Sequence, residues 1–226
     1  MNKLKQADTN KRIKKIISDF LFPKFCLICQ EEGEYLCQNC QAVIQVSTEH
    51  QKYSSQELSD LYSAVDYNNS FFKNIIYKFK YPPFAEEISE SLTLLIIEHL
   101  RSLDKEPNFS GFVIVPVPLH KKRLKWRGFN QAEKIGEKLS EALQIPMESN
   151  ILKKTKEASP QIELSRTERA INVKGCFEME KGTDAKNKRI LLVDDIFTTG
   201  ATMNECARIL KEAGAKKIIG IVIARD

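Results

Sequence analysis

The chain has 226 residues, of which 42% are hydrophobic and 29% charged, an ordinary composition for a globular protein with a sizeable core. No apolar stretch approaches the ~20 residues of a membrane-spanning helix, and the N-terminus lacks the apolar region of a secretory signal, so we expect a cytoplasmic protein. The formal net charge is +5, and residues 1–25 account for it. Any affinity for polyanions is therefore expected from this tail or from local clusters, not from a general positive field.

Residues 1–24 are predicted to form a basic amphipathic helix or tail. Its apolar residues fall on one helical face, and lysines and an arginine surround that face. The apolar residues are Ile13, Ile16, Ile17, Phe20 and Leu21. Such a helix can lie peripherally on an anionic membrane, grip nucleic acid or dock on a partner. We favour a plainer interpretation, in which the apolar stripe packs on the protein itself and the cations are solvated.

Two C-x-x-C pairs follow, formed by Cys26 with Cys29 and by Cys37 with Cys40. Each pair lets two thiolates converge on one ion, and four thiolates complete the closed tetrahedral shell of a structural Zn²⁺. Disulfides are disfavoured in a reducing cytoplasm, and iron–sulfur clusters usually have other cysteine spacings. We therefore predict a small zinc-binding module at residues 25–47, ahead of one larger domain at residues 48–226.

The first part of the larger domain is predicted to hold a strand and two helices. The hydrophobic pattern places them at residues 61–67, 71–79 and 85–103. The Pro82-Pro83 pair separates the two helices, because proline cannot continue a helix. Lys78 and Lys80 stand beside this break, and we interpret both as solvated lysines.

A basic segment follows the next strand. Residues 111–117 have the pattern of a short buried strand, and five of the seven residues at 121–127 are cations. An amphipathic helix then begins near Ala132. In a strand–loop–helix unit the loop lies at the carboxyl edge of a parallel sheet, where arginine side chains can bind phosphate oxygens. His120, at the start of the segment, is interpreted as a base for an acceptor or as a surface residue.

The most specific motif lies at residues 189–202. Ile190 to Val193 is an unbroken apolar run, typical of a strand buried on both faces, and Asp194 and Asp195 stand where that strand should end. Small residues then lead into a helix: Thr198, Thr199, Gly200, Ala201 and Thr202. The backbone N–H groups and positive dipole end of such a helix suit a phosphate, and paired carboxylates suit sugar hydroxyls and a hydrated Mg²⁺. A ribose that carries a 5′-phosphate needs all of these groups at once.

This motif resembles the 5-phosphoribosyl-1-pyrophosphate (PRPP) loop of type I phosphoribosyltransferases. The resemblance implies that Asp194 and Asp195 are the catalytic pair and hold the ribose 2′ and 3′ hydroxyls. It also implies that residues 198–202 cradle the 5′-phosphate and that Mg²⁺ accompanies PRPP.

Further residues narrow the resemblance to the ComF family of bacterial competence-associated proteins. They are Pro116, Pro118, Arg123, the run Arg127-Gly-Phe-Asn-Gln131, Arg169 and Asn172. Members of this family carry a four-cysteine zinc module before a phosphoribosyltransferase domain, and the resemblance spans residues 25–226. It implies that Arg123 and Arg127 contact the leaving pyrophosphate. Lys153 and Lys154 depart from the pattern, since relatives often carry an arginine there.

The expected fold is α/β: a type I phosphoribosyltransferase-like parallel sheet flanked by helices, with a small N-terminal zinc module. The expected activity is displacement of pyrophosphate from PRPP with Mg²⁺, with an unknown acceptor, in the DNA-uptake machinery of natural transformation. Residues 153–174 are expected to form a mobile loop that closes over the site. The resemblance implies single-stranded DNA and a competence helicase as partners. Two alternatives stay open: a non-catalytic adaptor that senses PRPP, and a protein that binds nucleic acid through its tail and zinc module.

Overall fold

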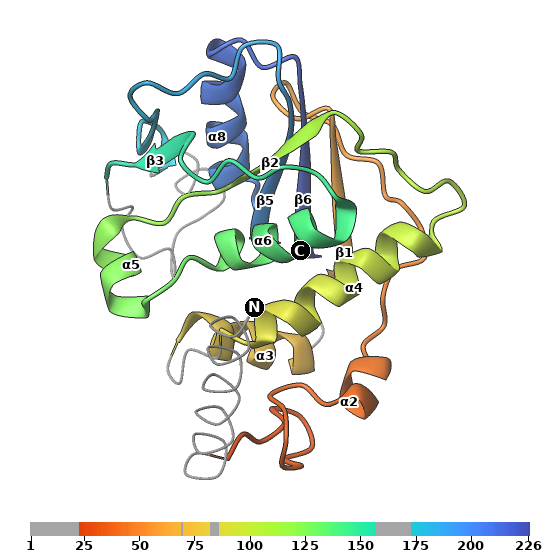
Figure 1. The fold of residues 1–226 in the computed structure, drawn as a ribbon. Coiled ribbons are helices and arrows are strands. Elements are labelled where there is room, and N and C mark those ends of the chain that lie inside the picture. The colour runs from red at the N-terminus through yellow and green to blue at the C-terminus, as the bar shows by residue number, and fades with distance from the viewer. Residues whose placement is uncertain (1–22, 69, 82–85, 157–172) are drawn as a thin grey trace, which may run out of the picture. The chain divides into compact units, whose positions relative to one another are not determined.

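The computed structural model describes residues 23–68, 70–81, 86–156 and 173–226 (Figure 1). The chain divides into two compact units, Met1–Ile44 and Gln45–Asp226. The predicted basic helix, the Pro82-Pro83 pair and most of the predicted mobile loop, with Arg169 and Asn172, lie outside the described residues. Within the described ranges, no helix is both long enough and apolar enough to cross a bilayer.

The larger unit is built on a four-stranded sheet with the order β1-β6-β5-β2, and all neighbouring strands are parallel. The strands are β1 (Asp60–Asp66), β2 (Phe112–Pro116), β5 (Arg189–Phe197) and β6 (Lys217–Arg225). Residues 190–193 are wholly buried, which confirms the prediction of a strand covered on both faces, and residues 218–224 of β6 are buried in the same way. Because the strands are parallel, their carboxyl ends meet at one edge of the sheet.

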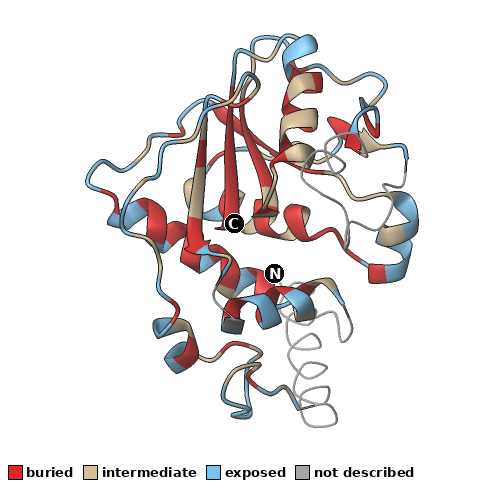
Figure 2. Cartoon of the chain, turned by 180° about the vertical axis from the view of Figure 1, so that it is seen from behind, coloured by how far each residue is buried: buried red, intermediate tan, exposed pale blue. Residues whose placement is uncertain are grey.

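Helices cover both faces of the sheet (Figures 1 and 2). On one face, Ile190 and Leu192 of β5 share a core cluster with Met203 of α8 (Ala201–Glu212). On the other, α4 (Ile88–Ser102) and α6 (Gln131–Leu143) pack against each other and against the strands. Gly136 of α6 lies so close to β2 that a Cβ there would come 3.2 Å from Cγ2 of Ile114. The prediction of a parallel sheet flanked by helices is confirmed.

The remaining elements are short. They are α2 (Gln38–Ala42) in the N-terminal unit, and α3 (Ser70–Lys80), α5 (Lys121–Arg127) and the antiparallel pair β3 (Leu152–Lys154) and β4 (Phe177–Met179) in the larger unit. β3 includes Lys153 and Lys154, so the first two residues of the predicted mobile loop are part of a strand.

Two sequence expectations need correction. The segment predicted as a basic loop forms helix α5, because it contains no glycine or proline before Gly128, which ends the helix in the left-handed conformation at φ 88°. The strand predicted to end at Val193 continues through Phe197, because β6 runs beside it and pairs as far as Arg225. Asp194 and Asp195 therefore lie inside β5, not beyond its end.

Candidate functional site

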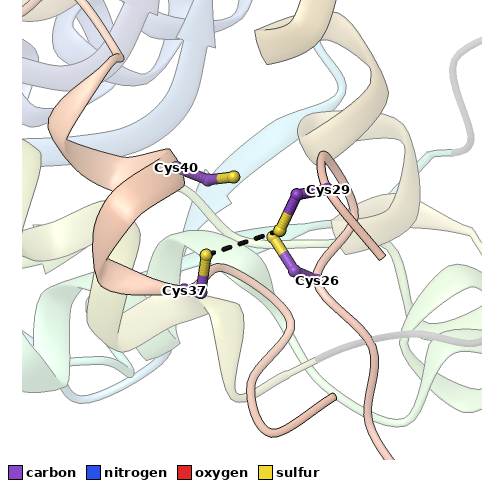
Figure 3. Close-up of side chains that lie close together, drawn as sticks. All are labelled: Cys26, Cys29, Cys37 and Cys40. Atoms are coloured by element: carbon purple, nitrogen blue, oxygen red, sulfur yellow. Dashed lines mark hydrogen bonds between the residues drawn. The ribbon is translucent and has the colours of Figure 1, made fainter. Parts of the chain in front are cut away.

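Four sulfur atoms converge in the N-terminal unit (Figure 3). The Sγ atoms of Cys26, Cys29, Cys37 and Cys40 all lie within 4.8 Å of one another, and those of Cys29 and Cys37 are 3.6 Å apart. In a tetrahedral Zn²⁺ site with Zn–S bonds of ~2.3 Å, neighbouring sulfurs are ~3.8 Å apart. The cluster therefore fits a metal such as zinc, held by four protein ligands with no open position.

Local backbone structure creates this convergence. Cys26 directly precedes a turn that includes Cys29, whereas Cys37 precedes α2 as its N-cap and Cys40 lies within that helix. Burial raises the pKa of the Cys26 thiol, but hydrogen bonds from the backbone N–H groups of Cys29, Cys37 and Ile28 outweigh it and lower the pKa to about 6. These N–H groups stabilise a thiolate, which is the form that binds metal.

A cavity of about 400 Å³ lies at the carboxyl edge of the sheet in the larger unit. Its size is within the range of pockets that bind small molecules. Its polar and aromatic lining comes from segments distant in the chain: Tyr67, Lys80, Tyr81, Arg123, Arg127, Asn130, Gln131, Lys154, Asp194, Asp195, Thr198 and Thr202. The bend at residues 198–202 and Asp194 also line a smaller adjoining hollow, which brings in Thr199, Gly200 and Ala201. A wider groove of about 910 Å³ at the opposite edge of the sheet contains none of the predicted residues.

The two acids leave β5 on opposite sides, because successive residues of a strand point to opposite faces, yet both reach the cavity. Asp195 is buried, and its Oδ1 lies 3.0 Å from Nζ of Lys80. Asp194 accepts a hydrogen bond of 2.8 Å from the backbone N–H of Asp195. Burial and then the charge of Asp195 raise the pKa of Asp194 to about 7, although Lys80 and Lys154 act against the shift. A negative charge on Asp194 is therefore costly beside Asp195 in the free protein.

The bend before α8 depends on one glycine. Gly200 is the N-cap residue with φ 76°, and a Cβ there would lie 2.5 Å from Cζ of Phe197 and 2.9 Å from Nδ2 of Asn204. Only glycine fits this position. The first turn of α8 contains no acidic residue, so the partial positive charge of its N-terminus is available to an anion beside the bend.

On the other side of the cavity, α5 and the start of α6 carry a hydrogen-bonded network. Arg127 is buried and donates from Nη1 to Oε1 of Gln131, whose Nε2 in turn donates to the carbonyl of Phe79 at 2.9 Å. Asn130 donates from Nδ2 to the carbonyl of Val117 at 3.0 Å. Among the described residues, Nε of Arg127 has no hydrogen-bond partner. Burial lowers the pKa of Arg127, but an arginine remains charged at neutral pH, so this buried donor suits an anionic ligand.

Sequence reasoning missed two cations of the cavity. Lys80, interpreted as solvated, places its ammonium on Asp195, so that interpretation is wrong. Lys154 lines the cavity as well, with its Nζ 4.9 Å from the ring centre of Phe177, and burial followed by the charge of Arg123 lowers its pKa. Lys80 belongs to no recognised motif, and the packing of α3 brings it to the cavity. Lys154 was noted only as a departure from the family pattern within the predicted loop, without a ligand-binding role.

His120 and Cys206 are placed differently. His120 is the N-cap residue of α5, is not among the residues that line the cavity, and its Nδ1 is buried without a partner within the described part of the chain. Cys206 is fully buried on α8, where burial raises the pKa of its thiol far above the usual range. A nucleophilic role for Cys206 is thereby disfavoured.

Comparison with known proteins agrees with this geometry. Residues 130–226 match the family described as "Phosphoribosyl transferase domain". The chain is 29% identical over 204 residues to Competence protein F of Haemophilus influenzae, covering 87% of this chain and 82% of that protein. It is 30% identical over 186 residues to Competence protein ComFC of Streptococcus pneumoniae, covering 80% of this chain and 71% of that protein. A third relative, Competence protein ComFC of Bacillus subtilis, is 33% identical over 146 residues, which cover 65% of this chain and 56% of that protein.

Fold, cavity and family match together define a protein with a phosphoribosyltransferase-like domain, preceded by a four-cysteine cluster. More narrowly, the chain belongs to the family of the competence proteins ComFC.

Proposed function

We propose that the protein is a phosphoribosyltransferase that binds PRPP at the carboxyl edge of its sheet and displaces the pyrophosphate. One observation carries this proposal: a single cavity brings together an acid pair, the hydroxyl-rich bend at a helix start and two arginines. PRPP has a diol, a 5′-phosphate and a pyrophosphate on one ring, and each part has a chemically matched group here.

Each group has a distinct role in the proposed complex. The ribose 2′ and 3′ hydroxyls donate to the carboxylates of Asp194 and Asp195. The 5′-phosphate accepts from the bend at residues 198–202 and from the start of α8. The pyrophosphate lies against Arg123 and Arg127, where it supplies the acceptor that the buried Nε of Arg127 lacks among the described residues.

The reaction asks for little covalent chemistry from the protein. The bond between C1 of the ribose and the pyrophosphate oxygen breaks, the electron pair leaves with pyrophosphate, and an acceptor's lone pair forms the new bond to C1. The arginines stabilise charge on the leaving group, and the acids orient the sugar and favour positive charge developing on its ring. Mg²⁺, when bound with PRPP, would neutralise further phosphate charge, and the oxygen atoms of Asp194 and Asp195 suit such a hard cation.

The relatives support a proposal for the biological setting. Proteins named for competence share the greater part of this chain, and we propose a function in the DNA-uptake machinery of natural transformation. The cytoplasm is the proposed compartment, because a reduced four-thiolate zinc site persists there, whereas oxidising compartments favour disulfides. For the basic tail at residues 1–24 we keep the interpretation with solvated cations, and a contact to an anionic partner or membrane surface is its alternative.

A second candidate is a non-catalytic adaptor that binds PRPP and single-stranded DNA, and it too has an observation in its favour. Tyr77, Tyr81 and Trp126 are exposed by 54%, 38% and 53%, and their rings form a row with centroid distances of 4.7 and 5.9 Å. Exposed aromatic rings beside the cations of α5 suit stacked bases and a phosphate backbone. In this role the protein would present DNA to a further partner, such as the competence helicase that the family resemblance implies.

Thermal unfolding with PRPP and Mg²⁺ tests the site. PRPP should raise the melting temperature of the wild type, and Asp194→Asn combined with Asp195→Asn should remove the increase. Asp104→Asn, at an exposed position away from the cavity, is the control. An unchanged increase in the double variant would reject the site. Screening acceptors for pyrophosphate release then separates the two candidates, because an adaptor binds PRPP without turnover.

A further inference from the structure

We propose that Lys80 is a third pyrophosphate-binding cation, held on Asp195 in the free protein and transferred to the leaving group when PRPP binds. The inference rests on the proposed PRPP site. It adds a substrate contact from α3, a helix that no motif of the sequence connects with phosphate.

The position of Lys80 carries the first step. It is the last residue of α3, and its side chain is 27% exposed where its Nζ meets Oδ1 of Asp195. The same side chain lines the cavity together with Arg123 and Arg127. An ammonium group that contacts Asp195 and shares its cavity with the two arginines is within the region where both halves of PRPP would lie.

The backbone of Lys80 is fixed, although its side chain is long. Phe79 is fully buried, and its ring lies 5.7 Å from the ring of Phe129. The Phe79 carbonyl accepts the Nε2 hydrogen bond of Gln131, whose Oε1 accepts from Arg127. One amide therefore ties the end of α3 to the pyrophosphate-side arginine. The flexible four-carbon stem of Lys80 allows its charge to change partners while α3 stays in place.

Electrostatic attraction explains why Lys80 would leave Asp195 for the pyrophosphate. In the free protein Asp194 and Asp195 repel each other, as the raised pKa of Asp194 indicates, and Lys80 offsets that repulsion. In the complex, ribose hydroxyls donate to the same carboxylate oxygens, and the pyrophosphate brings several negative charges against the single charge of Asp195. Attraction grows with the opposing charge, so the balance for Lys80 moves towards the pyrophosphate.

Calorimetric binding of PRPP, ribose 5-phosphate and pyrophosphate, each with Mg²⁺, tests this role. Lys80→Met should weaken PRPP and pyrophosphate binding about 10-fold, the effect of one charge-assisted hydrogen bond. It should leave ribose 5-phosphate binding within about twofold of the wild type or tighter, because the ligand no longer competes with an ion pair. Lys80→Arg should restore most of the PRPP affinity. Lys78→Met removes the same charge from the same helix, at a residue outside the cavity lining, and should match the wild type.

Retained ribose 5-phosphate binding also shows that the Lys80→Met variant is folded at the site. Equal weakening of ribose 5-phosphate and PRPP would mean that Lys80 only supports the structure, and would overturn the inference. So would an unchanged PRPP affinity in Lys80→Met. Failure of the wild type to bind PRPP is a separate result, read without any variant, and would overturn the proposed function together with this inference.

Discussion

The cysteine cluster draws four identical ligands from residues 26–40, whereas the cavity of the larger unit draws acids, cations and hydroxyls from α3, α5, β3, β5 and the start of α8. The cluster is closed, since its four sulfurs would supply every ligand of a tetrahedral metal site. The cavity is open, and two of its groups lack full compensation. The pKa of Asp194 is raised, and within the described residues the buried Nε of Arg127 has no hydrogen-bond partner. In a structural site, the protein itself supplies the partners of every polar or charged group. In a binding site, some of these groups find their partners only when the ligand binds.

The largest effect is expected from removing the metal of the cluster. Reduced, freshly purified protein should contain about one zinc per chain, and chelation should unfold the N-terminal unit, because apparent binding free energies of structural zinc reach ~10–16 kcal/mol. Cys40→Ser should act like chelation. Zinc analysis with limited proteolysis measures both effects, and PRPP binding by the larger unit should persist. Cys176→Ala, a cysteine outside the cluster, should leave the zinc content unchanged. Protein without zinc under these conditions contradicts the assignment.

In the cavity of the larger unit, Arg127→Met should have the largest effect on ligand binding. Arg127 is buried, so its charge is little screened, and its loss should weaken PRPP binding about 100-fold, or ~3 kcal/mol, the value of one to two charge-assisted hydrogen bonds. Lys125→Met, an exposed cation on the same helix, should change the affinity less than about twofold. Calorimetry measures both. Equal affinities in the two variants would show that α5 does not contact the pyrophosphate.

Parts of the fold that depend on local sequence signals could be predicted, and parts that depend on contacts between distant segments could not. Residues 190–193 were predicted as a buried strand because an apolar run bounded by polar residues is a local signal, and they are buried in β5. The helical character of α5 was missed, because a run of cations was taken as a loop although its residues favour a helix. The extension of β5 to Phe197 was missed as well, since it depends on pairing with β6.

For the candidate sites, spacing along the chain decided what could be predicted. The cysteine pairs and the run from Asp194 to Thr202 are contiguous, and the structure brings each set together. Lys80 reaches the cavity only through the packing of α3, which no local pattern marks, whereas Lys154 was noted as a departure from the family pattern but given no role in binding. The sequence therefore could not predict that a single lysine, distant in the chain from the motif, would line the cavity.

A smaller effect, on stability, is expected from the bend at the edge of the cavity. Gly200→Ala would adopt φ 76° and force its Cβ against the ring of Phe197, at a total cost of ~2–4 kcal/mol. Gly182→Ala is a matched control, since Gly182 has φ 80° but nothing lies within 4 Å of its added Cβ, so only the ~1–2 kcal/mol of backbone strain applies. Denaturant unfolding should separate the two variants. Equal losses would mean that the close approach to Phe197 relaxes at no cost.

The smallest effect tests the unbalanced charge itself. The pKa of Asp194 is raised to about 7 from an ordinary value of 3.8, by burial and then by Asp195, with Lys80 and Lys154 acting in the opposite direction. Between these two pH values the folded protein keeps a proton that the unfolded chain releases. The contribution of Asp194 to stability therefore falls as the pH rises from about 4 to about 7, and is constant above that range.

Asparagine has nearly the same shape as aspartate and is neutral at every pH, so Asp194→Asn should gain stability relative to the wild type as the pH rises. The gain should be small at pH 5 and reach ~1 kcal/mol by pH 8, because solvent at the cavity mouth reduces the full effect of the pKa shift. Denaturant unfolding at pH 5, 6.5 and 8 measures it, with Asp104→Asn as the control whose difference from the wild type should not vary over this range. If the Asp194→Asn difference is equally flat, the acid pair is fully balanced in the free protein. The cavity would then resemble the cysteine cluster in satisfying its own charges.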